Sequence, residues 1–441
     1  MSFDSQQLLH TLRSLTAEQD VARWLVAFSG GMDSAVLLHA LANVESQTPV
    51  VAVHINHGLH DDADGWAENC RQTVEKLDLD FICRTVVVNA DGVSLEAAAR
   101  DARYAELSTL LSPGDFLLSA HHQSDQAETL LLNLMRGSGP AGLAGIGMSQ
   151  RLGAGRLLRP LRDVSSDAIR DYATSHQLSW LDDPSNMDTR FDRNFLRHEI
   201  LPRLTERWPA VARQLARSAE LQGESNDGLV DLAAIDLASV GRCDRLNITA
   251  LQTLSQPRQR NLLRHAIRLS VLPSAPATRL EQILTELIPA DSDRQPLVSW
   301  AGAEVRRFRD EIFILPEAEP AAPPVTGIVT KASAPLELGP GLGALSAIPT
   351  MSYGIAPDLV EQGLELRFRC GGETLRIEPL GGTRKLKKLL QESDVLPWMR
   401  SKLPLFYVGE RLVAVADLWV DARCRAEPGF RIDWRDAPTL K

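Results

Sequence analysis

Residues 24–42 read WLVAFSGGMDSAVLLHALA and join two apolar segments of different kinds through a glycine-rich turn. The run Trp24–Phe28 is continuously apolar and has the length of a buried strand. After the turn, apolar residues recur at helical spacing over Ser34–Ala42. Strand, tight turn and helix in direct succession predict the first unit of an α/β sheet.

The same alternation continues on the carboxyl side of this unit. Further apolar runs occupy Val50–Asn56, Phe81–Val88 and Phe116–Ala120. Helical spacing is found in the segments between and after them: Asp64–Leu79, Ser94–Leu111 and Ser124–Arg136. Nearly continuous apolar strands that alternate with helices predict a doubly wound parallel sheet, Rossmann-like and covered on both faces. Ligands of such sheets bind beyond the carboxyl ends of the strands.

The turn after the first run is suited to hold phosphate groups. Two glycines permit a tight turn, and a helix start offers free N–H groups to an anion. No GK[ST] follows, so the turn is not a Walker A loop. A carboxylate repels phosphate unless Mg²⁺ bridges them, so Asp33 predicts a magnesium site. We expect a phosphate-bearing ligand to contact Ser29, Gly30, Gly31, Met32, Asp33 and Ser34. The structural alternative is a turn capped by Asp33 and Ser34.

Two further strand ends carry polar side chains. His54 and His57 lie at the end of the second run, and we assign His54 to the same ligand site. The fourth run is followed by HHQSDQAET (121–129), in which Asp125 and Glu128 project from one face of the first helical turn. Acidic residues there are also ordinary partners of the helix dipole. We expect Asp33, Asp125 and Glu128 to be catalytic, with Asp33 and Asp125 as metal ligands.

Paired arginines suggest sites for an anion. Arg100 and Arg103 share a helix face, as do Arg193 and Arg197, and guanidinium groups suit phosphate or an adenylate. We predict catalytic roles for Arg193 and Arg197; surface salt bridges are the alternative for both pairs. Between them, the glycine-rich stretch 136–145 predicts either a mobile loop that closes over reactants or a plain connector.

Composition restricts the class of protein. The 441 residues are 44% hydrophobic and 24% charged, without a run of 18 apolar residues or a signal-peptide layout, so we expect a cytoplasmic protein. Five scattered cysteines without a CxxC pair argue against a disulfide framework and a zinc knuckle.

The net charge of −10 conceals a gradient. Residues 1–150 hold 8 basic and 19 acidic residues, whereas 151–217 hold 12 and 9, and 367–402 hold 9 and 4. Such local basic surfaces suit phosphate contacts.

The remaining chain predicts smaller domains. We expect a catalytic domain at 1–217, a helical domain at 218–315, a Pro/Ala-rich linker region at 316–360 and a small α+β domain at 361–441. In the last domain, the segment 384–391 reads RKLKKLLQ and predicts a basic helix. Trp398 follows as a possible stacking surface, with a core tryptophan as the alternative.

These motifs together resemble one family. SGGMDS is similar to the SGGxDS signature of PP-loop ATP pyrophosphatases, and HHQSDQAET to the second segment of that superfamily. The HxxHGL, ExxxRxxRY and RGxGxxGLxG stretches, and D-x-SN…RNxLR…LP at 182–202, resemble the tRNA(Ile)-lysidine synthetases. The KKLLQE…PW-R…LPL pattern resembles their C-terminal domain. The likeness is weaker through the middle of the chain.

The resemblance implies a carbon–nitrogen ligase that attaches free L-lysine to C2 of the wobble cytidine of tRNA(Ile) with a CAU anticodon. ATP would adenylate the C2 oxygen and release pyrophosphate, and the lysine amine would then expel AMP. Glu128 or His122 would accept the amine proton. It further implies that ATP contacts residues 29–34 and His54, and that Arg103 is catalytic. It also implies tRNA binding by the domains at 218–315 and 361–441, with contacts from the C-terminal cations, which are Arg384, Lys385, Lys387, Lys388 and Arg400. No membrane partner is expected, and the oligomeric state is open, with a homodimer as one candidate.

Three other functions remain in view. A tRNA thiolase would need a reactive cysteine, whereas Cys70 and Cys83 fall within the second predicted helix and the third predicted strand. An amidotransferase-type synthetase would need a glutaminase domain, which we do not find in the sequence. A tRNA-binding protein with a degenerate nucleotide fold conflicts with the intact SGGMDS and HHQSDQAET motifs.

Overall fold

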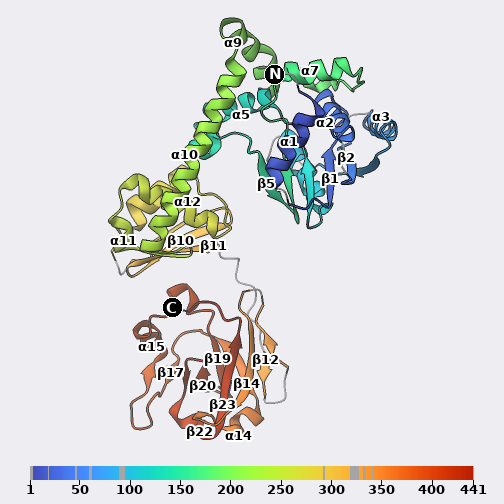
Figure 1. Ribbon diagram of the computed structural model, residues 1–441. Helices are drawn as coiled ribbons and strands as arrows, with labels where there is room; N and C mark the ends of the chain where they lie inside the picture. The colour runs from blue at the N-terminus through green and yellow to red at the C-terminus, as the bar shows by residue number, and fades with distance from the viewer. Residues whose placement is uncertain are drawn as a thin grey trace. The chain divides into compact units, whose positions relative to one another are not determined.

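The computed structural model describes residues 3–17, 19–44, 47–58, 62–88, 95–291, 294–317, 327–330, 334–339 and 341–440. The chain forms two compact units, Met1–Val230 and Asp231–Lys441 (Figure 1). Helix α10 (Val211–Val240) continues from the first unit into the second, past the domain boundary that we predicted at residue 217. Among the described residues, no helix is both long and apolar enough to cross a bilayer.

The first unit is built on a six-stranded sheet in the order β3-β2-β1-β4-β6-β5. All neighbouring strands are parallel except β5 and β6. The strands are β1 (Arg23–Ala27), β2 (Val50–Asn56), β3 (Asp80–Thr85), β4 (Asp115–Leu118), β5 (Ser149–Leu152) and β6 (Gly155–Leu158). From β1 the chain adds β2 and β3 on one side, and it then places β4 on the other side of β1. The gap between the carboxyl ends of β1 and β4 is therefore the topological switch point, where ligands bind in such sheets.

Helices cover both faces of this sheet, because its strands are apolar on both sides. They are α1 (Ser5–Thr16), α2 (Met32–Ala42), α3 (Ala63–Glu75), α4 (Leu95–Thr109), α5 (Gln123–Met135), α6 (Pro140–Leu143) and α7 (Ser166–Ser175). One core cluster joins the sheet to α1, α2, α3 and α7, and another joins its opposite face to α4. Along β1, Trp24 and Val26 face the first cluster and Leu25 the second. The predicted doubly wound fold is therefore confirmed.

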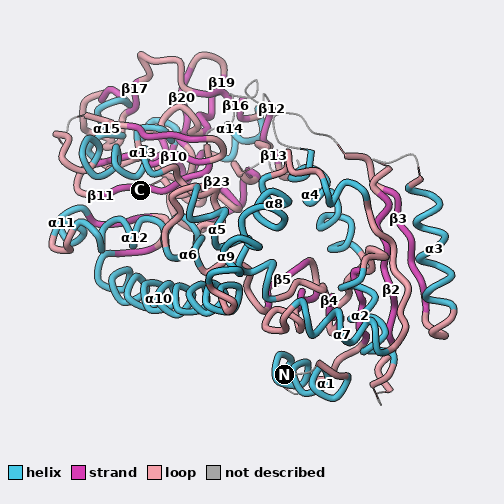
Figure 2. Tube along the Cα trace, turned by 90° about the horizontal axis from the view of Figure 1, so that it is seen from above, coloured by secondary structure: helices cyan, strands magenta, loops and turns pink. Residues whose placement is uncertain are grey.

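Short helical segments follow the sheet and lead into α10. They are η1 (Pro184–Met187), α8 (Asp192–Phe195), the π-helical turn η2 (Leu196–Ile200) and α9 (Leu201–Arg207). Helix α8 lies beside α5 (Figure 2). This contact brings residues about 70 positions apart in the sequence to the carboxyl edge of the sheet.

The middle of the chain contains a sheet that our helical prediction did not include. Strands β7 (Gly241–Arg242), β8 (Arg245–Asn247), β9 (Leu297–Trp300), β10 (Ala303–Phe308) and β11 (Glu311–Pro316) are antiparallel, in the order β7-β8-β11-β10-β9. The sheet packs on α11 (Ile248–Gln252), α12 (Gln256–Leu269), α13 (Ala277–Gln282) and η3 (Ile283–Leu287). The strands are short and partly exposed, so the helical periodicity of α12 dominates the sequence signal.

The C-terminal part contains two five-stranded sheets and one short ribbon. One sheet has the order β12-β16-β19-β20-β21, with strands Gly327–Val329, Leu364–Phe368, Pro404–Val408, Arg411–Val415 and Trp419–Val420. The other has the order β13-β14-β23-β15-β22, with strands Leu336–Glu337, Ala344–Thr350, Gly429–Arg435, Gly354–Ile355 and Arg425–Ala426. The ribbon pairs β17 (Thr374–Leu375) with β18 (Arg384–Lys385). Helices α14 (Pro357–Gln362) and α15 (Leu386–Glu392) and the 3₁₀ turns η4 (Pro397–Met399) and η5 (Ala422–Cys424) complete this part.

Strands β12 to β15 fall within the region 316–360 that we predicted as a linker. Strand β14 pairs along its full length with β23, and Leu345 and Ala347 belong to the C-terminal core. Alanine, proline and glycine give this segment a linker-like composition, whereas its alternating buried residues are those of a strand. Most of the Pro/Ala-rich stretch itself, residues 318–326 and 331–333, lies outside the described residues.

Candidate active site

The turn between β1 and α2 is held in shape by its own polar groups. Gly30 has φ +86°, and its carbonyl accepts a 2.9 Å hydrogen bond from the Leu181 N–H. The Ser34 hydroxyl donates to the Gly31 carbonyl at 2.9 Å, and the Ser29 hydroxyl accepts from the Gly31 N–H at 3.3 Å. The backbone of the SGGMDS segment is therefore preorganised before any ligand binds.

The N-terminus of α2 is open toward the end of the sheet. Its N-cap residue is Gly31, and no side chain caps the helix there. The first turn of a helix has N–H groups without partners inside the helix, and its dipole favours an anion. Ser34 is buried and its hydroxyl is engaged within the turn. Phosphate binding here would therefore use backbone N–H groups and the Ser29 hydroxyl more directly than Ser34.

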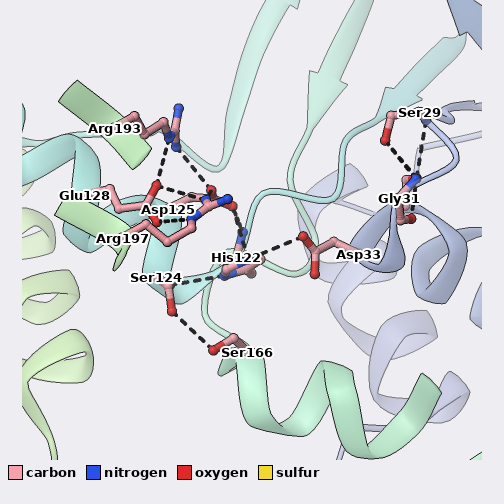
Figure 3. Close-up of polar contacts among 11 residues, drawn as sticks. Ser29, Gly31, Asp33, His122, Ser124, Asp125, Glu128, Ser166, Arg193 and Arg197 are labelled. Carbon is pink, nitrogen blue, oxygen red and sulfur yellow. Dashed lines mark hydrogen bonds and ion pairs between the residues drawn. The ribbon is translucent and has the colours of Figure 1, made fainter. Parts of the chain in front are cut away.

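His122 connects this turn to the start of α5 (Figure 3). Its Nε2 lies 3.5 Å from Asp33 Oδ2 and 3.6 Å from Asp125 Oδ2. The Ser124 N–H donates to Nδ1 at 3.2 Å, so in the neutral ring the proton lies on Nε2, between the two carboxylates. Burial lowers the pKa of His122, but the hydrogen bond to Asp33 and the charge of Asp125 outweigh it and raise that pKa overall. From the sequence we considered His122 only as a proton acceptor.

Asp125 and Glu128 are held by two arginines from the other side (Figure 3). Arg193 Nε lies 2.8 Å from Glu128 Oε2, and Arg197 Nε lies 2.7 Å from Glu128 Oε1. A terminal nitrogen of each guanidinium lies 3.1 Å from Asp125 Oδ1. We call these four residues the carboxylate–arginine cluster. Arg193 lies on α8 and Arg197 lies on η2. The i,i+4 spacing is kept across this junction, so both side chains reach the same pair of acids.

The carboxylate–arginine cluster combines burial with balanced charge. The Glu128 residue has no solvent exposure, and Asp125 is 8% exposed. Burial alone would raise the pKa of Asp125, but the charges of His122 and Arg193 outweigh it and lower that pKa. Two carboxylates and two guanidinium groups sum to zero formal charge. Removal of one member would leave an uncompensated buried charge, which typically costs about 3–5 kcal/mol.

A cavity of about 620 Å³ opens at this edge of the sheet. Its volume is in the range of sites for small molecules and cofactors. It extends from the β1 turn, past the end of β2, to α4 and α8. Lining residues that carry polar or aromatic groups include Ser29, His54, His57, Trp66, Arg100, Arg103, His121, Phe191 and Arg193.

The histidines of this cavity favour the neutral form. His54 Nδ1 lies 2.9 Å from the Phe28 carbonyl, and burial lowers its pKa. Burial, followed by the charge of Arg103, lowers the pKa of His57. Burial lowers the pKa of His121 to about 3. Burial also lowers the pKa of Arg103, the predicted catalytic arginine of α4. The cationic groups of the cavity are therefore the arginines and not the imidazoles.

Asp33 is the residue that best fits a metal ion. Its Oδ1 is buried and has no hydrogen-bond partner among the described residues. Both oxygens of Asp125, by contrast, already accept hydrogen bonds from arginine or backbone donors. The described residues include no group of three acidic, histidine or cysteine side chains placed to hold a metal. Mg²⁺ commonly uses one or two carboxylates together with substrate phosphates, so Asp33 is sufficient to fit it.

The predicted tRNA-binding residues lie in the second unit. Lys385, Lys387 and Lys388 are exposed at the β18–α15 junction. Arg384 pairs with Glu392, and Arg400 Nε donates to the Val395 carbonyl at 2.9 Å. Lys388 Nζ lies 4.0 Å from Glu392 Oε1, so Lys385 and Lys387 are the most available cations of this set.

Trp398 is occupied within the protein. Its ring lies 5.2 Å from that of Phe313, edge to face, and Arg306 lies 5.5 Å from the ring centroid. Trp398 is therefore better described as a packed tryptophan than as a surface on which RNA bases stack.

The structure brings most predicted catalytic residues to one edge of the sheet. Asp33, Asp125, Glu128, Arg193 and Arg197 form a continuous polar network through His122. Arg103 lies in the adjoining cavity. Phe191, which the sequence motifs did not single out, also lines that cavity. The sequence signal that could have identified Phe191 is its position, two residues before the first arginine of the RNxLR motif.

Three protein families match successive parts of the chain. The PP-loop domain matches residues 4–204, the TilS substrate binding domain residues 246–313, and the TilS substrate C-terminal domain residues 364–434.

Curated relatives extend the match over nearly the whole chain. A tRNA(Ile)-lysidine synthase of Alkalilimnicola ehrlichii is 44% identical, over 95% of this chain and 95% of its own. The enzyme of the same name from Pseudomonas putida is 40% identical, over 93% and 96%. That of Xanthomonas campestris pv. campestris is 39% identical, over 94% and 95%. Among solved structures, the U34-tRNA thiolase NcsA of Methanococcus maripaludis gives a TM-score of 0.42 at 18% identity, over 50% of this chain and 78% of that chain.

Proposed function

The chain belongs to the tRNA(Ile)-lysidine synthase family, and we propose that it joins L-lysine to C2 of the wobble cytidine of tRNA(Ile). The observation that carries the proposal is the carboxylate–arginine cluster, which lies next to an open phosphate-binding turn. The turn is suited to bind the phosphates of ATP. The cluster is suited to a reaction in which an amine attacks and a proton is released.

In the first step, the C2 oxygen of cytidine attacks the α-phosphorus of ATP. An O–P bond forms, the bond to the β-phosphate oxygen breaks, and pyrophosphate leaves. Backbone N–H groups at the start of α2 and the Ser29 hydroxyl hold the phosphates, and Arg103 offsets negative charge that develops during the transfer. Mg²⁺, held by Asp33 and phosphate oxygens, would neutralise phosphate charge when bound.

In the second step, the ε-amine of lysine attacks C2 of the adenylated base. A C–N bond forms, the C2–O bond breaks, and AMP leaves with that oxygen. The nitrogen must give up its protons, and we assign Glu128, which is buried and paired with Arg193 and Arg197, as the acceptor of one. Arg193 and Arg197, which pair with this carboxylate, would stabilise the departing AMP.

The arginines also address the charge of the incoming amine. Free lysine has a pKa of about 10.4, and two unpaired carboxylates would hold it protonated. In the carboxylate–arginine cluster those carboxylates are balanced by two guanidinium groups. Nearby positive charge favours the neutral amine. We therefore propose that Arg193 and Arg197 keep the lysine nucleophile reactive near neutral pH.

Transfer of radiolabelled L-lysine to a tRNA(Ile) transcript tests this function. The reaction should require ATP, and a transcript with uridine in place of the wobble cytidine should remain unlabelled. AMP and pyrophosphate should form in amounts equal to the lysine incorporated. Release of AMP and pyrophosphate without lysine incorporation would refute lysine as the nucleophile.

A further inference from the structure

Two phenylalanines are exposed beside the carboxylate–arginine cluster. Phe191 is 38% exposed and Phe195 45% exposed, although aromatic residues make up only 5% of the chain. They flank Arg193: Phe191 is the N-cap residue of α8, Phe195 is its last residue, and the Phe195 N–H donates to the Phe191 carbonyl at 2.9 Å. Exposed aromatic rings next to buried ionic groups need an explanation, since large apolar side chains are usually buried.

The two rings differ in what they face. Phe191 lines the cavity together with Arg193 and Asn194, whereas Phe195 is not among its described lining residues. Phe191 therefore contributes an aromatic side chain to a cavity whose lining also includes arginines, histidines, the turn after β1 and the aromatic residues Phe28 and Trp66. A ligand that contacts this wall needs an apolar planar surface and negative charge nearby. An unpaired nucleotide base with its backbone phosphate has both.

The chain around Phe191 is already fixed. The Phe191 N–H donates to the Asp188 carbonyl at 3.3 Å, and Asn194 Nδ2 donates to the same carbonyl at 3.0 Å. His198 Nε2 lies 2.8 Å from the Asn186 carbonyl. A ring on a preformed turn loses little conformational freedom when a ligand stacks on it.

We propose that Phe191 is the stacking platform for the wobble cytosine of the tRNA. This inference rests on the proposed function. The reaction needs C2 of an unpaired base close to Glu128, and bases that undergo chemistry leave the stack to enter a pocket. Phe191 is two residues from Arg193, whose guanidinium contacts Glu128. Single-stranded bases commonly stack on aromatic side chains.

Adenine of ATP is the competing occupant of this wall. The other end of the cavity is the better site for adenine. The phosphate-binding turn follows β1, and His54, His57 and Trp66 lie at and after the end of the neighbouring strand β2. Helix α3, which carries Trp66, packs against β2 and β3, whereas α8 packs against α5 (Figure 2). Trp66 and Phe191 therefore belong to different walls, and Arg193, in the wall of Phe191, contacts Glu128 behind it.

Steady-state kinetics with three variants test the proposal. Phe191→Ala should lower kcat/KM for tRNA roughly 10-fold to 100-fold, because one base can no longer stack, and should leave the KM for ATP unchanged. Phe191→Tyr keeps an aromatic face and should retain activity within about 3-fold of the wild type. Phe195→Ala, the matched control on the same helix, should behave as the wild type. Where Phe191→Ala does not fold, Phe191→Leu keeps an apolar side chain without the aromatic face.

A binding experiment separates this proposal from the proposed function. An anticodon stem-loop RNA carries fluorescent pyrrolocytidine at the wobble position, and its emission falls when that base stacks. Wild-type protein and Phe195→Ala should quench it, and Phe191→Ala or Phe191→Leu should not. Equal quenching by all folded variants, or a raised KM for ATP with an unchanged KM for tRNA in Phe191→Ala, would overturn the stacking role. Failure of the wild type to incorporate lysine would refute the proposed function, whereas the quenching result concerns Phe191 alone.

Discussion

At the scale of single residues, Gly30 and Gly31 differ in how much the structure depends on them. A Cβ on Gly30 would lie 2.8 Å from Cys70 Sγ and 3.1 Å from Leu181 Cδ1, and φ there is +86°. On Gly31, the nearest atom to a Cβ is Ser29 Oγ at 3.5 Å, which is ordinary contact. The SGGMDS motif predicted that both glycines face a ligand. It could not reveal the contact of Gly30 with Leu181, because that residue lies about 150 positions away in the sequence.

Gly30→Ala should therefore lower the free energy of unfolding by about 1–3 kcal/mol, through backbone strain and steric overlap. Gly31→Ala should change it by less than about 1 kcal/mol. Urea unfolding midpoints of both variants and the wild type measure the difference. Equal destabilisation by the two substitutions would show that the turn does not have the described conformation.

Arg197 provides a test of the electrostatic role of the carboxylate–arginine cluster. If its charge lowers the pKa of the bound lysine amine, Arg197→Gln should raise that pKa and move the rising limb of the kcat–pH profile to higher pH. The loss of activity should therefore be largest at low pH and smaller at alkaline pH. Arg197→Lys keeps the charge and should leave the limb in place, even if the rate falls. Parallel profiles for Arg197→Gln and the wild type would contradict this role.

At the scale of elements, the glycine-rich segment after α5 is anchored by that helix. Gln126 Nε2 donates to the Ala144 carbonyl at 3.1 Å, and its Oε1 accepts from the Ile146 N–H at 2.6 Å. Asn133 Nδ2 donates to the Gly142 carbonyl at 2.7 Å. Glycine content predicted a mobile loop or a connector, because periodicity does not reveal side chains that satisfy a loop backbone from a neighbouring helix.

Gln126→Ala should release this segment without unfolding the sheet. The Ile146 amide, which then has no acceptor, should exchange its hydrogen at least about 10-fold faster, as expected for a decrease of about 1.4 kcal/mol or more in local stability. Gln123→Ala in the first turn of α5 is the matched control. Hydrogen exchange followed by mass spectrometry or NMR measures the effect, and unchanged protection at Ile146 would contradict the anchoring role.

In the first unit, sequence patterns predicted strands β1 to β4 and helices α2 to α5 to within a few residues, whereas α1, β5 and β6 were not predicted. Its strands are buried on both faces and its helices are amphipathic, so each element has a strong local signal. The β-rich parts were less predictable. Strands β8 and β15 have two or three residues each and pair with β11 and β22, which lie far along the chain. Likewise, the i,i+4 spacing predicted that Arg193 and Arg197 act together, but not that they pair with Asp125 and Glu128.

At the scale of the whole molecule, the second unit should contribute affinity for tRNA and not chemistry. Lys387 and Lys388 are exposed on α15. Each phosphate that a protein no longer neutralises makes the slope of log K against log salt shallower by about 0.7–0.9. The double variant Lys387→Ala/Lys388→Ala should therefore bind tRNA more weakly at low salt, with a shallower salt dependence, and show little change in kcat at saturating tRNA.

Arg431→Ala/Arg435→Ala removes the same charge from exposed positions on β23 and is the matched control. Filter binding between about 50 and 200 mM salt spans the range in which phosphate contacts are most evident. Equal decreases in affinity for the two double variants would indicate general charge attraction and not a contact at α15.

The central claim is that Glu128, within the carboxylate–arginine cluster, serves the attack of lysine on an adenylated cytidine. The most direct test is a single-turnover reaction of Glu128→Gln with α-labelled ATP, tRNA(Ile) and lysine. We predict that label accumulates on the tRNA as an adenylate while lysine incorporation falls at least about 100-fold, the range expected when a general base is removed. Lysine incorporation at the wild-type rate by folded Glu128→Gln protein would contradict the claim.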